Sequence, residues 1–418
     1  MAKEKLIIIG GGASGLIAAK KLAGKYETIL LEAATQVGGR VWSRLSQSQS
    51  RIIEGGAEFI HGHQKQTLKL LRKAGIEYVP VKGKMYGRLQ GKWVEQHEMI
   101  PGWDALMKKM KKLKEDVSLD DFLDTFFSDD RYVELRQHAI RYAEGFDLAD
   151  TGRVSAQWLY REWSAEEEEV FRIPAGYGAL IHFLKQECEK KGCRILTNHT
   201  VRQVDWEKNS VRVYTNGNDI FDAHKLIVTI PLSILVQAAN KSSVNFTTPL
   251  DEYVKAANNI GIGAVIKVVL HFQQSFWPTD MGFVFSDQLF PTWWTQLPDT
   301  MPVLTGWVGG QSAQRLSSDS NDQLLEKAIA SLSAVFNKTH HELKAALLEW
   351  HIFNWQNEEL NLRGYTYDTL KTKAARKLLN TPVADTIFFA GEGLYDGKSP
   401  GTVEAALISG REVASKLS

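Results

Sequence analysis

Residues 6–20 read LIIIGGGASGLIAAK, and this stretch sets the class of the fold. The apolar run over 6–9 predicts a buried strand, and a G-x-G-x-x-G motif follows it directly. Apolar residues at helical spacing continue over 13–25, and the apolar run over 28–31 predicts a second strand that ends at Glu32. Strand, glycine-rich turn, helix and strand in this order predict a βαβ unit of the Rossmann-like α/β class.

The glycines of this motif predict contact with a pyrophosphate. Gly10 permits a tight turn, Gly12 lets the backbone approach the phosphates, and Gly15 lets helix and strand pack closely. The N-terminus of the helix presents unpaired N–H groups to the anion. Glu32 stands at the spacing at which an acid accepts hydrogen bonds from a ribose diol. The motif alone does not separate NAD from FAD, and a glycine-rich turn without a ligand is the structural alternative.

The composition argues against several classes of protein. For 418 residues we expect two or three domains. Lys plus Arg is 50 and Asp plus Glu is 49, a balance that argues against a protein whose main task is to bind nucleic acid. The two cysteines, Cys188 and Cys193, argue against a disulfide framework and a metal site, so we expect a reducing, cytoplasmic setting. No segment reaches ~18 consecutive apolar residues, so we expect no membrane span.

The middle of the chain predicts helices first and strands afterwards. Residues 103–165 have helical spacing with Ser118 as an N-cap, and the β-branched run 262–272 predicts a long strand. The run MKKMKKLK at 107–114 indicates a solvated helix face or a contact for an anionic partner or membrane surface. The acidic run 166–169 indicates a solvated face or a rim that steers a cationic substrate.

Motifs near the C-terminus complement the first glycine-rich turn. FFAGEG covers 388–393, and GTVEAALISGR covers 401–411. A strand that ends at Gly391 and a helix that begins near Thr402 predict a second anion site lined by backbone. A cofactor that is contacted from both ends of the chain is long and has a second reactive ring. FAD fits this description, whereas NAD does not normally need the distant motif.

Three blocks in this order resemble the flavin-containing amine oxidase family: GGGASG…LLEA…GGR at 10–40, GGAEFIHG at 55–62 and FFAGEG…GTVEAALISGR at 388–411. The family contains monoamine oxidases, polyamine and spermine oxidases and flavin histone demethylases. The resemblance implies a discontinuous FAD domain (1–82, 176–240 and 385–418) and an α+β substrate domain with a mixed sheet and a helical insertion (83–175 and 241–384). It implies FAD contacts at Gly10, Gly12, Ala13, Ser14, Gly15, Glu32, Ala33, Gly38, Gly39, Arg40, Gly55, Gly56, Ala57, Glu58, Val201, Trp355, Gly391, Glu392, Gly401, Thr402, Val403 and Ala406.

The resemblance also implies two residues beside the flavin. Lys267 ends the run GAVIK and matches the family's lysine that holds a water on flavin N5. A lysine that points outward from an edge strand is the structural alternative. Tyr365 follows the Asn354-Trp355 segment and matches the family's aromatic residue beside the flavin. Monoamine oxidases carry a flavin-linked cysteine just before that tyrosine, and Gly364 stands there in this chain, which implies non-covalent FAD.

Three further positions bear on the substrate. His61 lies in I-H-G, the form of animal-type polyamine and spermine oxidases, and either contacts the substrate or is a hydrogen-bonded structural residue. Phe59 stands where L-amino-acid oxidases carry an arginine, which disfavours an amino-acid substrate. Thr402 replaces the second aromatic ring of monoamine oxidases, so the pocket is expected to be wider and to favour a polyamine or a bulky amine.

The expected reaction is oxidation of an amine C–N bond to an imine by hydride transfer to flavin N5, with O2 reoxidising the flavin to give H2O2. Lys267 would assist at N5, Tyr365 would orient the amine, and His61 would contact it. The partners are then a small-molecule amine and O2. Two alternatives stay open: an FAD-dependent desaturase or isomerase of a non-amine substrate, and a flavin-binding protein without turnover. The sequence does not set the oligomeric state.

Overall fold

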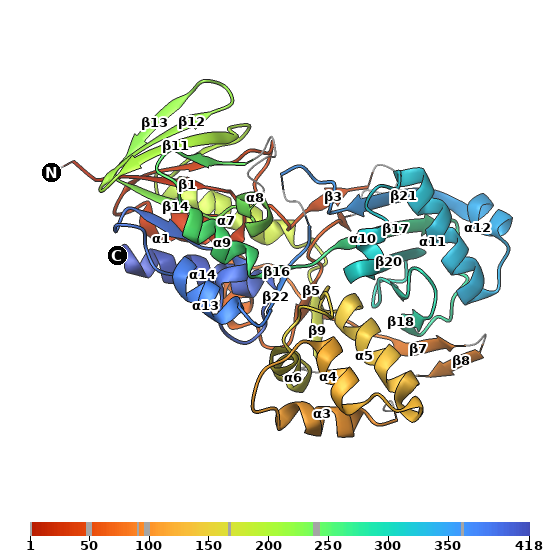
Figure 1. The fold of residues 1–418 in the computed structure, drawn as a ribbon. Helices are drawn as coiled ribbons and strands as arrows, with labels where there is room; N and C mark the ends of the chain where they lie inside the picture. The colour runs from red at the N-terminus through yellow and green to blue at the C-terminus, as the bar shows by residue number, and fades with distance from the viewer. Residues whose placement is uncertain are drawn as a thin grey trace.

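The fold is taken from a computed structural model, which describes residues 2–46, 52–89, 92–95, 101–165, 169–236, 243–360 and 363–418. The Ser-rich segment 47–51 and residues 166–168 of the acidic run lie outside the described residues. Both chain ends lie in one part of the molecule, a large sheet with helices forms another, and the helices α3–α6 form a third group (Figure 1).

A parallel sheet of five strands lies next to the two chain ends. Its order is β10-β2-β1-β14-β23, with bounds Arg194–Leu196, Glu27–Leu31, Lys5–Ile9, Lys225–Val228 and Ile387–Phe389. Both faces are buried, as expected for parallel strands, because side chains alternate across the sheet. Leu6 and Ile8 pack on α1 (Ala13–Leu22), α7 (Gly178–Lys190) and α14 (Val403–Lys416). Ile7 and Ile9 pack on the opposite face.

That opposite face is covered by a smaller sheet and three helices. The sheet has the order β13-β12-β11-β15, with bounds Ile220–Ala223, Ser210–Thr215, Val201–Glu207 and Asn245–Phe246. The helices are α8 (Leu232–Val236), α9 (Asp251–Asn258) and α13 (Thr372–Leu379). The strands of the five-stranded sheet come from three separate parts of the chain, residues 5–31, 194–228 and 387–389. We therefore propose that these parts form one discontinuous FAD domain, as predicted.

A mixed sheet of seven strands forms the second large layer. Its order is β21-β17-β20-β19-β18-β7-β8, with bounds Leu347–Asn354, Val265–Phe272, Val303–Gly309, Thr292–Trp294, Met281–Ser286, Lys84–Leu89 and Lys92–Glu95. It packs on α10 (Gly310–Arg315), α11 (Asn321–Phe336) and α12 (His340–Ala346). Every residue of β17 is buried, because β20 and β21 pair with its two edges and apolar clusters cover both of its faces.

The predicted helical region forms a separate apolar cluster. Its helices are α3 (Trp103–Lys111), α4 (Leu119–Phe126), α5 (Val133–Gly145) and α6 (Ala156–Ser164). Ser118 caps α4, as its place in the sequence predicts, because its hydroxyl accepts a hydrogen bond from the Asp121 N–H. No helix among the described residues is long and apolar enough to cross a membrane.

Short elements connect these layers. They are α2 (Lys65–Ala74) and the strands β3 (Ser43–Leu45), β4 (Ile52–Glu54), β5 (Phe59–His61), β6 (Val79–Pro80), β9 (Val170–Arg172), β16 (Gly261–Ile262) and β22 (Thr366–Tyr367). The predicted single strand over 262–272 was wrong in one respect. The segment divides at Gly263 into β16 and β17, because β16 pairs with β22 whereas β17 pairs with β20 and β21. Only glycine fits at 263, since a Cβ there would lie 2.2 Å from Leu148.

Candidate active site

One cavity of ≈ 1710 Å³ connects the glycine-rich motifs with the residues predicted to do chemistry. Sites for a single small ligand usually measure ~300–1,000 Å³, so this cavity has room for a dinucleotide and a second molecule. The predicted residues that line it are Gly10, Gly12, Ala13, Ser14, Glu32, Ala33, Gly38, Gly39, Arg40, Gly56, Ala57, Glu58, His61, Val201, Lys267, Trp355, Tyr365, Gly391, Glu392, Gly401, Thr402, Val403 and Ala406.

Gly15 and Gly55 do not belong to that lining and have packing roles instead. A Cβ on Gly15 would lie 2.0 Å from the Gly10 carbonyl oxygen, so only glycine lets α1 pack so closely on the turn. A Cβ on Gly55 would lie 2.6 Å from the Phe353 ring, and the Gly55 carbonyl accepts a hydrogen bond from Trp355 Nε1 at 2.9 Å.

The start of α1 fits a pyrophosphate. A Cβ on Gly12 would meet no atom within 4 Å, so the backbone there faces open space. The buried Ser14 hydroxyl has no hydrogen-bond partner among the described residues, although a buried hydroxyl normally has one. Gly391, at the end of β23, also faces open space. An anionic group contacted from both chain ends would satisfy these groups, so the residues present fit FAD.

Glu32 closes the first βαβ unit beside this turn. Its carboxylate accepts hydrogen bonds from the Gly11 N–H at 2.6 Å and the Ala34 N–H at 2.8 Å. Desolvation by burial raises the pKa of Glu32 above its usual value. Each carboxylate oxygen can accept more than one hydrogen bond, so Glu32 can still accept hydroxyl groups of a ribose.

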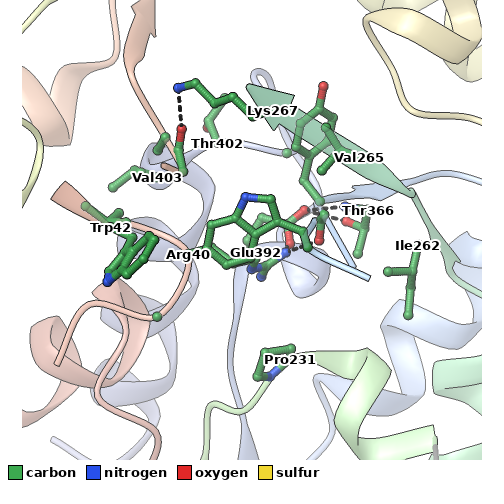
Figure 2. A pocket seen from close by; sticks show the side chains of 18 of the residues that line it. Arg40, Trp42, Pro231, Ile262, Val265, Lys267, Thr366, Glu392, Thr402 and Val403 are labelled. Carbon is green, nitrogen blue, oxygen red and sulfur yellow. Dashed lines mark hydrogen bonds and ion pairs between the residues drawn. The ribbon is translucent and has the colours of Figure 1, made fainter. Parts of the chain in front are cut away.

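A charged pair joins the N-terminal motif to the C-terminal one. Arg40 lies 3.1 Å from the Glu392 carboxylate and donates a hydrogen bond to the Gly364 carbonyl at 2.6 Å. Glu392 also accepts hydrogen bonds from the N–H and the hydroxyl of Thr366, at 2.9 and 2.6 Å. Figure 2 shows Arg40, Glu392 and Thr366 together at the pocket wall. Thr366 was missed from the sequence, since no motif marks it.

Lys267 lies in β17, an interior strand whose residues are all buried, which excludes the alternative of an outward-pointing lysine on an edge strand. Its side chain is 1% exposed, and its Nζ lies 2.7 Å from a Glu58 oxygen and 3.3 Å from the Gly56 carbonyl. Desolvation alone would raise the pKa of Glu58, but Lys267 and Arg172 together hold it below its usual value.

Tyr365 and Thr402 lie near each other at the cavity. The Tyr365 hydroxyl donates a hydrogen bond to the Phe146 carbonyl, and burial raises its pKa far above the usual range. A Cβ on Gly401, whose φ is +70°, would lie 2.9 Å from the Tyr365 ring, so a side chain there would collide with it. Thr402 is the N-cap of α14: its hydroxyl accepts from the Ala405 N–H at 3.2 Å and donates to the Ser399 carbonyl at 2.6 Å.

His61 ends β5 and is solvent-exposed, because its ring lines the cavity. The ring makes edge-to-face contacts with Phe59 and Phe146, at centroid distances of 6.0 and 5.9 Å. Desolvation lowers the pKa of His61 to about 4, so the imidazole is neutral at pH 7. A neutral imidazole offers one acceptor and one donor nitrogen to a ligand.

The structure adds aromatic and acidic wall residues that sequence reasoning missed. Along α5, His138 stacks on Tyr142, and Tyr142 stacks on Phe146 at 5.6 Å with an interplanar angle of 2°. The spacing of four residues between these rings is a helical signal that could have identified them. The further aromatic and acidic lining residues are Trp42, Phe283, Phe285, Trp294, Trp307, Phe353, Glu144, Glu162, Asp287, Glu358 and Glu359.

A sequence model of flavin-containing amine oxidoreductases matches residues 13–418. The chain belongs to this family. It is therefore an oxidoreductase of amines that uses a flavin, as the resemblance implies, and this finding disfavours both alternatives, a non-amine substrate and a protein without turnover.

The relatives of this amine oxidoreductase are distant but cover its full length. Polyamine oxidase 2 of Arabidopsis thaliana is 25% identical over 97% of this chain and 86% of its own length. Lysine-specific histone demethylase 1B of Mus musculus is 24% identical over 99% of this chain, which spans 53% of that relative. The solved structure of putrescine oxidase with putrescine has a TM-score of 0.81 at 18% identity, covering 99% of both chains. This likeness confirms the predicted fold class.

Proposed function

We propose that the chain is an FAD-dependent oxidase that converts an amine C–N bond to an imine with O2 as acceptor. One observation carries the proposal: a single cavity joins the phosphate-binding turn at Gly12 to Lys267, Tyr365 and His61. Water then hydrolyses the imine to an aldehyde and an amine. The balanced reaction is R–CH2–NH–R′ + O2 + H2O → R–CHO + R′–NH2 + H2O2.

FAD would be held by the start of α1, by Glu32 and by the N-terminus of α14. When bound, FAD accepts a hydride from the amine carbon and passes two electrons to O2. We propose that it is held without a covalent bond. Gly364 has no side chain to form one, and a Cβ at this position would lie 2.7 Å from Leu148.

The residues in front of the flavin would bind and prepare the amine. The Tyr365 ring offers a cation–π contact worth about 0.5–2 kcal/mol, so other groups must also hold the amine. His61 is neutral at pH 7, and a nitrogen of its ring can accept a hydrogen bond from the amine, which must have lost its own proton to solvent before its carbon is oxidised.

We propose a di- or polyamine, or an amine on a bulky group, as the substrate. Thr402 stands in place of a second aromatic ring, so the cavity is wider beside it. Its hydroxyl is already hydrogen-bonded to the Ser399 carbonyl and the Ala405 N–H, and it does not bind the amine. Carboxylates line the same cavity at Glu144, Glu162 and Glu358, which favours a ligand that carries a second positive charge. Polyamine oxidase 2 and other relatives with polyamine oxidase names support this choice.

Steady-state kcat/KM for spermine, putrescine, benzylamine and tyramine tests the substrate class. We expect the two aliphatic polyamines to exceed the two arylalkylamines, because only they place a second cation among the carboxylates. If the arylalkylamines win by about tenfold or more, a difference of ~1.4 kcal/mol in transition-state binding, the pocket argument is wrong.

A further inference from the structure

Glu58 joins the cavity wall to two buried cations. One of its oxygens lies 2.7 Å from Lys267 Nζ. The other lies 3.2 Å from an Arg172 nitrogen and accepts a hydrogen bond from Trp294 Nε1 at 3.0 Å. The charged side chains are 7%, 1% and 9% exposed for Glu58, Lys267 and Arg172, so water screens the network little. Glu58 and Lys267 line the cavity, whereas Arg172 lies behind them.

We propose that Glu58 is a positioning residue that keeps Lys267 protonated and fixed at the cavity wall. An ammonium in an apolar strand loses its proton unless a counter-charge is near, because desolvation disfavours the charged form. Glu58 supplies that charge. Together with the Gly56 carbonyl it engages two of the three N–H donors of Lys267, which leaves one donor for a molecule in the cavity.

Arg172 has a matching role behind Glu58. It is held by Gln296 Oε1 at 2.9 Å, and its charge helps to keep Glu58 ionised in spite of its burial. Two cations and one carboxylate give the network a net charge of +1 at the wall. A fixed positive charge stabilises the negative charge that develops on O2 as it gains electrons. This last step rests on the proposed function, whereas the ion network does not.

The other ionisable side chains around Lys267 are retained in the variants below, and the one coupled to it titrates at the lower edge of the pH window used there. Glu54 on β4 interacts with the charges of both Lys267 and Glu58, and burial raises its pKa to about 7. The flanking strand β20 has no ionisable side chain, and β21 contributes His351, which pairs with Glu349 at 2.8 Å. On β17 itself the second ionisable side chain is His271.

Thermal unfolding of the FAD-loaded protein between about pH 7 and pH 10 tests the proposal. Glu58→Gln keeps the shape of the side chain and removes its charge. Lys267 in the folded variant should then release its proton well below the ~10.4 of an unfolded lysine. Over that pH window the unfolded variant binds more protons than the folded variant, so the free energy of unfolding of the variant rises with pH. The difference in Tm between wild type and Glu58→Gln should therefore become about twofold smaller, or more, as the pH is raised from 7 to 10.

Two further variants separate positioning from packing. In the double variant Glu58→Gln with Lys267→Met, the difference in Tm from wild type should no longer depend on pH. The single variant Glu58→Asp keeps the negative charge and should show the same dependence of Tm on pH as wild type. A gap that stays constant with pH, or that narrows equally in the double variant, overturns the proposal. These melting curves require no catalytic turnover. Their outcome is therefore independent of the kcat/KM measurements with the four amines.

Arg172→Met gives a second test if Glu58→Gln does not fold. With one cation removed, the folded-state pKa of Glu58 rises toward its usual value. The stability that wild type owes to ionised Glu58 is present above the ~4.3 of an unfolded glutamate and is lost as pH falls through the lower folded value. The Tm gap between wild type and Arg172→Met should therefore close on acidification. Parallel acid profiles contradict the role of Arg172.

Discussion

Lys267 is the residue at which burial, charge and chemistry meet. It lies in β17, an interior strand of the seven-stranded sheet. Its Nζ is 5.5 Å from the centre of the Trp294 ring, and Glu58 balances its charge. Substrate oxidation builds positive charge on the amine carbon, and O2 reduction builds negative charge on oxygen. A cation at this wall therefore favours the second half-reaction over the first.

Lys267→Met should slow reoxidation by O2 about tenfold or more and change anaerobic reduction by the amine much less. Stopped-flow measurement of the two half-reactions separates these rates. Lys225→Met is the matched control, because Lys225 is also buried and ion-paired, to Asp385 at 3.0 Å, and does not line the cavity. Equal reoxidation rates in wild type and Lys267→Met would contradict the assignment.

Gly364 leads to a prediction about the cofactor bond. Because the residue before Tyr365 has no side chain, we expect FAD to leave the protein intact when it unfolds. Acid precipitation should move all of the yellow colour into the supernatant. Yellow colour that stays in the pellet would show a covalent bond between FAD and the protein and would contradict the prediction.

At the scale of elements, α1 offers a glycine at each end for comparison. A Cβ meets nothing within 4 Å at Gly12 or at Gly24, but only Gly12 lines the cavity. Gly12→Val should weaken FAD binding about tenfold or more, because its side chain would occupy the space next to the turn. Gly24→Val should leave the dissociation constant of FAD unchanged. Titration of the apoprotein with FAD measures both, and equal affinities would refute the placement of the pyrophosphate.

The elements that could be predicted from sequence are those with local signals. The βαβ unit, the N-cap Ser118 and the C-terminal helix follow from periodicity and capping chemistry. The break at Gly263 and the short strands of the small sheets were missed, because pairing with distant strands such as β22 sets them. Periodicity does not report on such contacts.

The site was predictable in its motifs and not in its network. Resemblance pointed to Lys267 and to Glu58, but their ion pair joins residues 209 positions apart, and only the folded chain brings them together. Arg172 carries no motif at all. The ring stack of α5 had a helical signal at 138, 142 and 146, whereas its place on the cavity wall depends on how the helical group packs on the sheets.

At the scale of the whole molecule, the cavity exists because three separated segments meet. Arg40 from the first motif bonds to Gly364, 324 residues away, and pairs with Glu392. The turn predicted to bind phosphate and the wall with Lys267 thus belong to one connected structure. We propose that electrons pass through this cavity from an amine to O2.

Anaerobic titration of the purified protein with spermine is the direct test of this electron transfer. Substrate should bleach the visible absorbance of the oxidised flavin, because the flavin takes up two electrons from the amine. Admission of air should restore the absorbance, with one H2O2 released for each flavin reoxidised. A flavin that stays oxidised with spermine, putrescine, benzylamine and tyramine alike would contradict the account.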